Sequence, residues 1–325
     1  MRICVVGAGA IGGYLGAKLA LAGEDVTLIA RGPHLAAIKR DGLKLQIGDA
    51  PAEVVPGVRA LSDMAEAGEQ DAVLLTLKTH SVPGVVKQMR ALYGRQTIVL
   101  TAQNGVPWWY FMRHGGEFEG RRLESVDPGG VIADNLEIER VIGCIVYPAA
   151  DLPAPGVVRH VEGDRFSLGE PDGSKSERVL ALSQTLARAG LKAPVRTNLR
   201  AEIWVKVWGN AFFNPISALT GTTLEEICSF PATRELARVA MTESMTVAER
   251  LGIKFGVTLE QRIDGAQKVG AHKPSMLQDI ETQRPTEVDA VVGAVVELGR
   301  IVGVPTPVTD TLYRAVKLLE KRVRG

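Results

Sequence analysis

The first 197 residues alternate short, almost continuously apolar runs with segments whose apolar residues recur at helical spacing. Runs of this kind fit strands that are buried on both faces of a parallel sheet and covered by helices. The pattern therefore predicts an α/β fold with a doubly wound, mostly parallel sheet. The predicted strands are Arg2 to Val6, Val26 to Ala30, Ala72 to Leu77 and Thr97 to Thr101.

The pattern of apolar and polar residues changes between about residues 140 and 170, and again after Asn198. Short apolar runs separated by Pro and Gly predict an antiparallel edge of the same sheet, followed by a helix near Glu177 to Ala189. Beyond Asn198, apolar residues recur at i, i+3 and i+4, which predicts an all-helical domain over 198–325 after a sheet domain over 1–197. The expected edge runs are 141–146, 156–158 and 166–168, and helix breaks are expected at Pro215, Pro231, Pro274, Pro285 and Pro305.

Charge and composition narrow the class of protein. Lys and Arg number 38 against 37 Asp and Glu, so the formal net charge is +1 and no basic face for nucleic acid or membrane lipid is expected. No apolar run approaches the roughly 18 residues of a membrane span, and no signal peptide precedes the first strand, so a cytoplasmic location is expected. The three cysteines and five histidines are scattered, which predicts neither disulfides nor a metal site.

A glycine-rich loop follows the first predicted strand directly. It has the spacing G-x-G-x-x-G and leads into a helical run, which together favour a Rossmann-type site for a dinucleotide. The first glycine permits a tight turn, the second lets the backbone approach a pyrophosphate, and the third permits close helix packing. The alternative is a plain strand-to-helix turn. The loop consists of Gly7, Ala8, Gly9, Ala10, Ile11 and Gly12.

The residue after the second strand indicates which dinucleotide binds. An acidic residue there would bond the ribose hydroxyl of NAD, but the sequence has Ala30, Arg31 and Gly32. A guanidinium pairs well with a 2′-phosphate, so NADPH/NADP+ is the expected cofactor. The alternative is that Arg31 is an ordinary surface arginine.

Two further polar residues stand where strands are expected to end. Lys78 follows the third predicted strand, and Asn104 follows the fourth and precedes Gly105. Ligands of open parallel sheets lie beyond the carboxyl ends of the strands, so both residues are candidates for the same site. Each taken alone is equally well explained as a loop lysine or an Asn-Gly turn.

A polar stripe marks the first helix of the second domain. Lys206, Asn210 and Asn214 recur every four residues and share one face of an otherwise apolar helix. The alternative is a solvated face with a Glu202–Lys206 ion pair, but such a face gains nothing from Gly209 and Asn210, both poor helix formers. An ammonium here can stabilise a developing alkoxide and protonate it, while the carboxamides orient substrate oxygens.

The segment that contains Ser275 and Glu287 has residue types that fit helix capping as well as a role in binding. Ser275 would cap one helix, Thr286 would cap the next, and Glu287 would favour that helix's positive end. Either interpretation fits these residues taken alone.

Taken together, the motifs resemble the ketopantoate reductase (2-dehydropantoate 2-reductase) family over nearly the whole chain. They are the glycine loop, Leu77-Lys78, Gln103-Asn104-Gly105, Trp204-x-Lys206-x3-Asn210-x3-Asn214-Pro215, and Ser275 to Ile280 with Glu287. The resemblance implies NADPH-dependent reduction of 2-dehydropantoate to pantoate, with substrate held in a cleft between two domains.

The resemblance also assigns roles to individual residues. Lys206 would donate the proton and Glu287 would hydrogen-bond the new hydroxyl. Lys78 and Asn104 would lie between nicotinamide and substrate, and Arg31 would take the 2′-phosphate. Asn210, Asn214 and Ser275 would bind the substrate.

One segment departs from the family pattern. Trp108, Trp109, Tyr110 and Phe111 follow Asn104-Gly105, and a polar, glycine-rich stretch continues to about Asn135. The aromatic run is explained as core, as a reshaped pocket, or as a lid or subunit contact. A reductase of another 2-oxo acid and a non-enzymatic NADP(H)-binding redox sensor therefore stay open, as does a homodimer.

Overall fold

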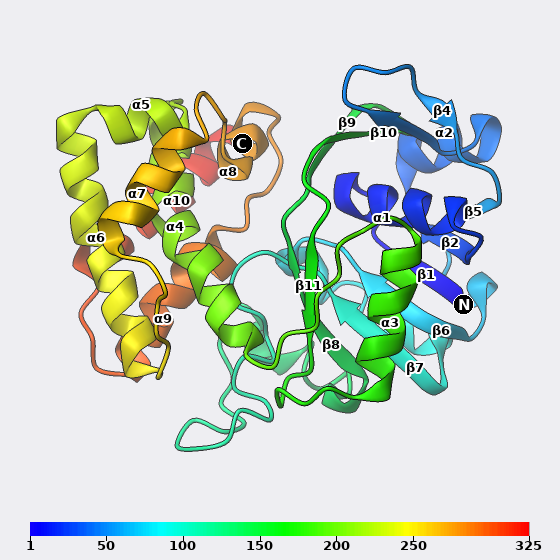
Figure 1. Ribbon diagram of the computed structural model, residues 1–325, viewed down its shortest axis with the longest axis horizontal. Coiled ribbons are helices and arrows are strands. Elements are labelled where there is room, and N and C mark those ends of the chain that lie inside the picture. Colours follow the sequence, from blue (N-terminus) through cyan, green and yellow to red (C-terminus); the bar gives the residue numbers. More distant parts are fainter. Residues whose placement is uncertain (325) are drawn as a thin grey trace. The chain divides into compact units, whose positions relative to one another are not determined.

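The computed structural model describes residues 1–324, which fold into two compact units (Figure 1). The first comprises Met1–Gln103, Phe111–Arg121 and Gly130–Leu199, and the second comprises Asn104–Tyr110, Arg122–Gly129 and the chain from Arg200 onward. The two short segments of the second unit are tied to its helices by backbone donors. Val106 N donates to Ala290 O over 2.9 Å, and Ser125 N donates to the Glu297 carboxylate over 2.8 Å.

The first unit is built on a seven-stranded sheet with the order β11-β8-β7-β6-β1-β2-β5. All neighbours pair in parallel except β11, which runs antiparallel to β8 at the edge. The fold class expected from the apolar runs is confirmed. The strands are β1 (Arg2–Val6), β2 (Asp25–Ile29), β5 (Val58–Leu61), β6 (Gln70–Leu75), β7 (Tyr93–Thr101), β8 (Val141–Val146) and β11 (Phe166–Gly169).

A second, four-stranded sheet corrects the expectation of a single antiparallel edge. Its order is β4-β3-β10-β9, so the run at 156–158 belongs to this sheet, and β8 pairs in parallel with β7. Strand β10 pairs antiparallel with β9 and in parallel with β3, which lies more than a hundred residues away. Local periodicity carries no sign of the pairing with β3. The strands are β3 (Lys44–Ile47), β4 (Glu53–Val54), β9 (Ala149–Ala154) and β10 (Val157–Glu162).

Three helices belong to the first unit: α1 (Ala10–Leu21), α2 (Gly32–Asp41) and α3 (Glu177–Arg188). Helix α3 confirms the helix expected near Glu177. Between β6 and β7 the chain forms only short 3₁₀ turns, η2 (Thr79–Ser81) and η3 (Gln88–Leu92), because Pro83 and Gly84 interrupt any longer helix.

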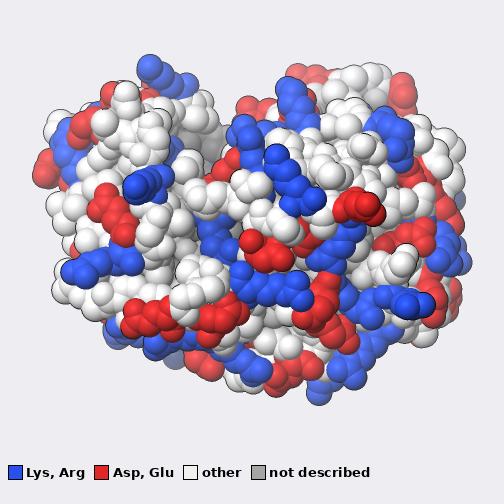
Figure 2. Space-filling view, turned by 60° about the horizontal axis from the view of Figure 1, so that its bottom comes forward, with Lys and Arg blue, Asp and Glu red and all other residues white. Residues whose placement is uncertain are grey.

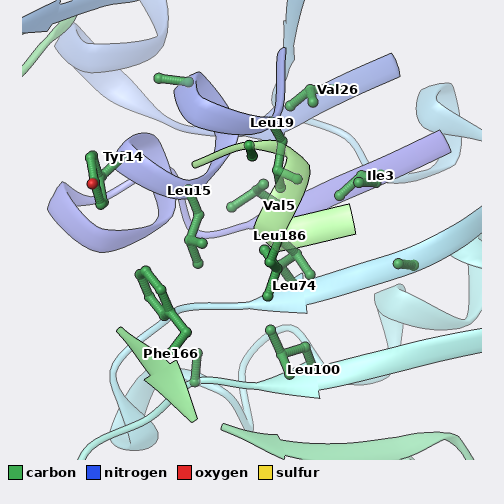
Figure 3. Packing of buried hydrophobic residues seen from close by; sticks show 14 of the residues in the cluster. Ile3, Val5, Tyr14, Leu15, Leu19, Val26, Leu74, Leu100, Phe166 and Leu186 are labelled. Atoms are coloured by element: carbon green, nitrogen blue, oxygen red, sulfur yellow. The ribbon is translucent and has the colours of Figure 1, made fainter. Parts of the chain in front are cut away.

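One face of the main sheet carries the core of this unit. Figure 3 shows Leu15 and Leu19 of α1 and Leu186 of α3 gathered with Val5, Leu74 and Leu100 of the strands. Burying each such side chain contributes roughly 1.5–3 kcal/mol. On the other side of α1, Gly13 lies against Val158 of β10, and Tyr14 stacks on His160 with ring centroids 4.5 Å apart. Helix α1 therefore packs between the two sheets and fixes the loop at its start.

From α4 to the last described residue the second unit is helical, as expected. Its elements are α4 (Leu199–Thr220), α5 (Leu224–Ser229), α6 (Pro231–Arg250), α7 (Leu259–Lys268), α8 (Ser275–Glu281), the π-helical η6 (Asp289–Gly293), α9 (Ala294–Ile301) and α10 (Pro307–Arg324). Trp208, Phe212 and Phe213 of α4 pack in a core with residues of α5, α6 and α7, which Figure 1 shows grouped together.

Four of the five expected proline breaks are confirmed, and one is wrong. Pro231 begins α6, Pro274 caps α8, and Pro285 and Pro305 lie between helices. Pro215 lies inside α4, whose helix continues to Thr220. Buried residues before and after Pro215 hold both halves of α4 in place, so packing outweighs the lost backbone hydrogen bond.

The surface carries charges of both signs. Figure 2 shows Lys and Arg interspersed with Asp and Glu over the face in view. Within residues 1–324, no helix is long and apolar enough to cross a membrane, and no three His, Cys, Asp or Glu side chains are grouped as a metal site. The three cysteines are buried thiols.

Candidate functional site

The glycine loop of the first unit is shaped by its own backbone. Gly7 has a φ of +108°, which favours glycine, and the Thr76 hydroxyl donates to its carbonyl oxygen over 2.7 Å. A Cβ at Gly12 would overlap that same carbonyl and the Thr76 hydroxyl, and would lie 3.0 Å from Val5 Cγ1. These two glycines are required by the fold itself.

Packing does not require a glycine at position 9. A Cβ at Gly9 would meet no atom within 4 Å, and its φ is negative. Gly9 is also the N-cap of α1, so no side chain caps that helix. An open, uncapped helix start lets a phosphate approach the backbone amides, which fits a dinucleotide pyrophosphate.

Arg31 stands beside this loop within the first unit. The amides of Gly7 and Ala8 donate to the carbonyl of Ile29, the last residue of β2, over 3.3 and 3.1 Å. Arg31 follows two residues later as the N-cap of α2 and is exposed. No ion pair or side-chain hydrogen bond holds its guanidinium among residues 1–324, so its donors are available to a bound phosphate.

Helix α4 is fixed in rotation by two buried indoles of the second unit. Trp204 Nε1 donates to the hydroxyl of Tyr110 over 2.7 Å, and Trp208 Nε1 donates to Met241 O over 2.8 Å. Burial raises the pKa of Tyr110 to about 12, so the hydroxyl stays neutral and accepts this bond. Because the indoles occupy the buried faces, half-buried Lys206 and Asn210 share another face of the helix.

Lys206, Asn104 and Glu287 form a hydrogen-bonded chain. Lys206 Nζ donates to Asn104 Oδ1 over 2.6 Å, and Asn104 Nδ2 donates to Glu287 Oε2 over 3.3 Å. The carboxamide thus presents its acceptor to a cation and its donor to an anion, which fixes its orientation. The three sequence-predicted residues meet within the second unit.

The loop that carries Asn104 is held by contacts with the π-helical turn η6, which the sequence did not predict. Gly105 has a φ of +89°, and a Cβ there would lie 2.6 Å from the carbonyl carbon of Ala290. Ala290 belongs to the π-helical turn η6, and its oxygen accepts the bond from Val106 N. Such turns often occur at functional sites. Here η6 begins two residues after Glu287 and thereby fixes Asn104 next to it.

The remaining candidate residues lie on separate elements. Asn210 and Asn214 follow Lys206 by one and two turns of α4, and Asn214 is only 7% exposed. Ser275 is exposed and begins α8, so the expectation that it caps that helix is wrong, because Pro274 is the N-cap. The expectation that Thr286 caps the next helix is also wrong: Thr286 accepts a hydrogen bond from Val288 N over 3.2 Å, but Val288 is the N-cap of η6. Lys78, in the first unit, is half-buried and lies three residues beyond β6.

The aromatic segment that departs from the family pattern is core. Trp108, Trp109, Tyr110 and Phe111 are each no more than 5% exposed. Their burial explains the run without a lid or a subunit contact.

The chain is similar to known proteins over nearly its whole length. Residues 3–173 match the family described as ketopantoate reductase PanE/ApbA, and residues 198–320 match its C-terminal part. The 2-dehydropantoate 2-reductase of Mesorhizobium japonicum is 54% identical over 320 residues, which cover 98% of each chain. A crystal structure of a Ralstonia solanacearum protein assigned as a ketopantoate reductase has a TM-score of 0.94 and 41% identity, covering 99% of this chain and 98% of that one.

More distant structures share the fold alone. D-mandelate dehydrogenase, solved with NADH and anilino(oxo)acetate, has a TM-score of 0.84 at 23% identity, with 99% of each chain covered. A dimeric ketopantoate reductase from Staphylococcus aureus has a TM-score of 0.76 at 22% identity, covering 99% of this chain and all of that one. With both of its parts matched along nearly its full length, the chain belongs to the ketopantoate reductase family.

Proposed function

We propose that this protein reduces 2-dehydropantoate to pantoate with NADPH, on the pantothenate route to coenzyme A. The hydrogen-bonded chain of Lys206, Asn104 and Glu287 is the observation that carries the proposal. Reduction of a ketone needs a proton at the oxygen, and a positioned ammonium supplies one. Family membership and the 54% identical relative support the same substrate.

Lys206 acts as the general acid in this proposal. Its Nζ gives a proton to the keto oxygen as negative charge develops there, and its own charge stabilises that oxygen beforehand. The bond to Asn104 fixes the direction of one of the three N–H donors, which orients the ammonium. Glu287 holds the Asn104 amide and accepts a hydrogen bond from the hydroxyl that forms.

The polar face of α4 binds the substrate in this proposal. Within residues 1–324, the side-chain amides of Asn210 and Asn214 and the hydroxyl of Ser275 carry no hydrogen bond. Buried carboxamides are nearly always hydrogen-bonded, so Asn214 in particular is suited to a bound oxygen or hydroxyl. Each carboxamide offers both a donor and an acceptor.

The first unit holds the cofactor. A bound nicotinamide supplies the hydride that is added to the keto carbon. The loop from Gly7 to Gly12 holds the pyrophosphate at the start of α1, with Gly9 leaving room for it. Arg31 pairs with the 2′-phosphate and thereby favours NADPH over NADH, and Lys78 contacts the nicotinamide side of the site.

Substrate identity is tested by following NADPH oxidation against a panel of 2-oxo acids that includes 2-dehydropantoate. We expect a preference for 2-dehydropantoate by at least tenfold in kcat/KM. A stronger preference for another 2-oxo acid would reassign the substrate within the same chemistry. Binding of NADPH with no turnover on any member would favour the redox sensor instead.

The cytoplasmic location and the homodimer stay predictions. Sedimentation of the purified protein tests the second, and a single species at twice the monomer mass is the expected result.

A further inference from the structure

His34 joins helix α2 to the second sheet of the first unit. Its ring Nδ1 accepts a hydrogen bond from Gly156 N over 3.0 Å. Gly156 lies in the turn between β9 and β10 and has a φ of +79°, and a Cβ there would lie 2.9 Å from the Cβ of Ala37 in α2. The carbonyl of Gly156 accepts in turn from Lys44 N of β3 over 2.9 Å. The turn therefore approaches α2 as closely as a glycine permits, and the imidazole supplies the polar contact.

The same ring lies beside the glycine loop. Burial lowers the pKa of His34, and the neighbouring carbonyl of Ala8 opposes that shift. Because Nδ1 accepts the bond from Gly156, the ring is neutral and carries its proton on Nε2. Nε2 is buried as well and forms no hydrogen bond of good geometry within residues 1–324. His34 therefore stands between the second sheet and the loop that holds the pyrophosphate in the proposed function.

The start of α2 depends on this contact because little else holds it. Arg31 is the N-cap, no side chain caps the helix, and Pro33 has no N–H to donate. Residues 31–33 are exposed, whereas His34 is half-buried. The next residue, Leu35, adds apolar contact with the core but no direction. The hydrogen bond of His34 thus fixes the first turn of α2, one turn from Arg31.

We propose that His34 is a positioning residue that holds Arg31 in place for the 2′-phosphate of NADPH. The inference rests on the proposed function, in which Arg31 binds that phosphate and the glycine loop binds the pyrophosphate. One cofactor bound by both elements requires a fixed spacing between them, because hydrogen bonds to phosphate depend on distance and direction. His34 contacts both elements and keeps that spacing. It thereby raises the preference for NADPH over NADH without contacting either cofactor.

The test measures the Kd of NADPH and of NADH by fluorescence titration in wild type, His34→Phe and His34→Gln. Phenylalanine keeps a ring but removes both nitrogens, so we expect the preference for NADPH to fall roughly 2- to 12-fold, the range for one lost hydrogen bond. Glutamine again offers an acceptor to Gly156 N and should keep the preference within about twofold of wild type. Lys39→Gln removes an exposed charge from the same helix and should leave the preference unchanged.

Combination with Arg31→Ala separates positioning from general stability. If His34 acts through Arg31, the double variant Arg31→Ala/His34→Phe should have the same NADPH preference as Arg31→Ala alone. A purely structural histidine would instead lower Tm and weaken both cofactors equally, with no change in preference. If His34→Phe fails to fold, His34→Leu is compared with His34→Gln by the same ratio of Kd values.

Three results would overturn the proposal. An unchanged NADPH preference in folded His34→Phe would show that the imidazole does not position Arg31. A further loss of preference in the double variant would show that His34 acts independently of Arg31. An equal loss in His34→Gln would mean that the hydrogen bond from Gly156 is not what matters. A wild-type protein that binds NADH as tightly as NADPH would instead remove the proposed cofactor, a failure visible before any variant is made.

Discussion

Lys206 and Asn104 are 102 positions apart in the chain, yet the lysine Nζ donates to the asparagine Oδ1 over 2.6 Å. The contact joins α4 to the loop that follows β7, and both partners belong to the second unit. This hydrogen bond orients the Lys206 ammonium, because the Asn104 carboxamide is itself held by its bond to Glu287.

Replacement of Asn104 by leucine tests that orientation. Asn104→Leu keeps the volume of the side chain but removes both hydrogen bonds. A bond to a charged group contributes about 1.5–3 kcal/mol, so kcat should fall roughly 10- to 150-fold. NADPH affinity, measured by fluorescence titration, should change little. A variant with wild-type kcat would mean that Lys206 needs no partner at Asn104.

Gly105→Ala tests how the loop is held. The substitution combines strain at a φ of +89° with a clash against the carbonyl of Ala290. Gly115→Ala is the matched control, because Gly115 has a φ of +72° and open space around its Cβ position. We expect Gly115→Ala to lose about 1 kcal/mol of unfolding free energy by denaturant titration. Gly105→Ala should lose more and also lower kcat. Equal losses in both variants, with unchanged turnover, would argue against the positioning role.

Arg31→Ala tests cofactor choice. Loss of a charge-assisted bond should weaken NADPH binding by about 1.5–3 kcal/mol and leave NADH binding almost unchanged. Arg40→Ala removes a charge from the same helix, where Arg40 pairs with Asp41, and serves as the control. Equal weakening of both cofactors in Arg31→Ala would contradict the assignment of Arg31 to the 2′-phosphate.

The sequence predicted those features that depend on local chemistry. Continuous apolar runs identified β1, β2, β6 and β7 because parallel strands are buried on both faces. The edge strand β5 (Val58–Leu61) of the same sheet was not predicted. The glycine loop was visible because Gly7 and Gly12 are demanded by neighbouring backbone. Lys206, Asn210 and Asn214 were recognisable as a stripe because helical spacing puts them on one face.

Features that depend on long-range contact could not be predicted. The second sheet arises from pairing between β3 and β10, which no local pattern encodes. Pro215 looked like a helix end, but tertiary packing carries α4 through it. Gly209 was noticed as out of place in a helix, yet only the structure shows that Arg262 occupies the space.

The central claim is that Lys206 donates the proton, and kcat of Lys206→Ala with 2-dehydropantoate tests it most directly. A general acid contributes about 10² to 10⁴ in rate, so kcat should fall by that factor while the Kd of NADPH stays unchanged. Lys206→Arg should remain slow as well, because a guanidinium keeps the charge but holds its proton too tightly to donate it. Wild-type kcat in Lys206→Ala would contradict the mechanism outright.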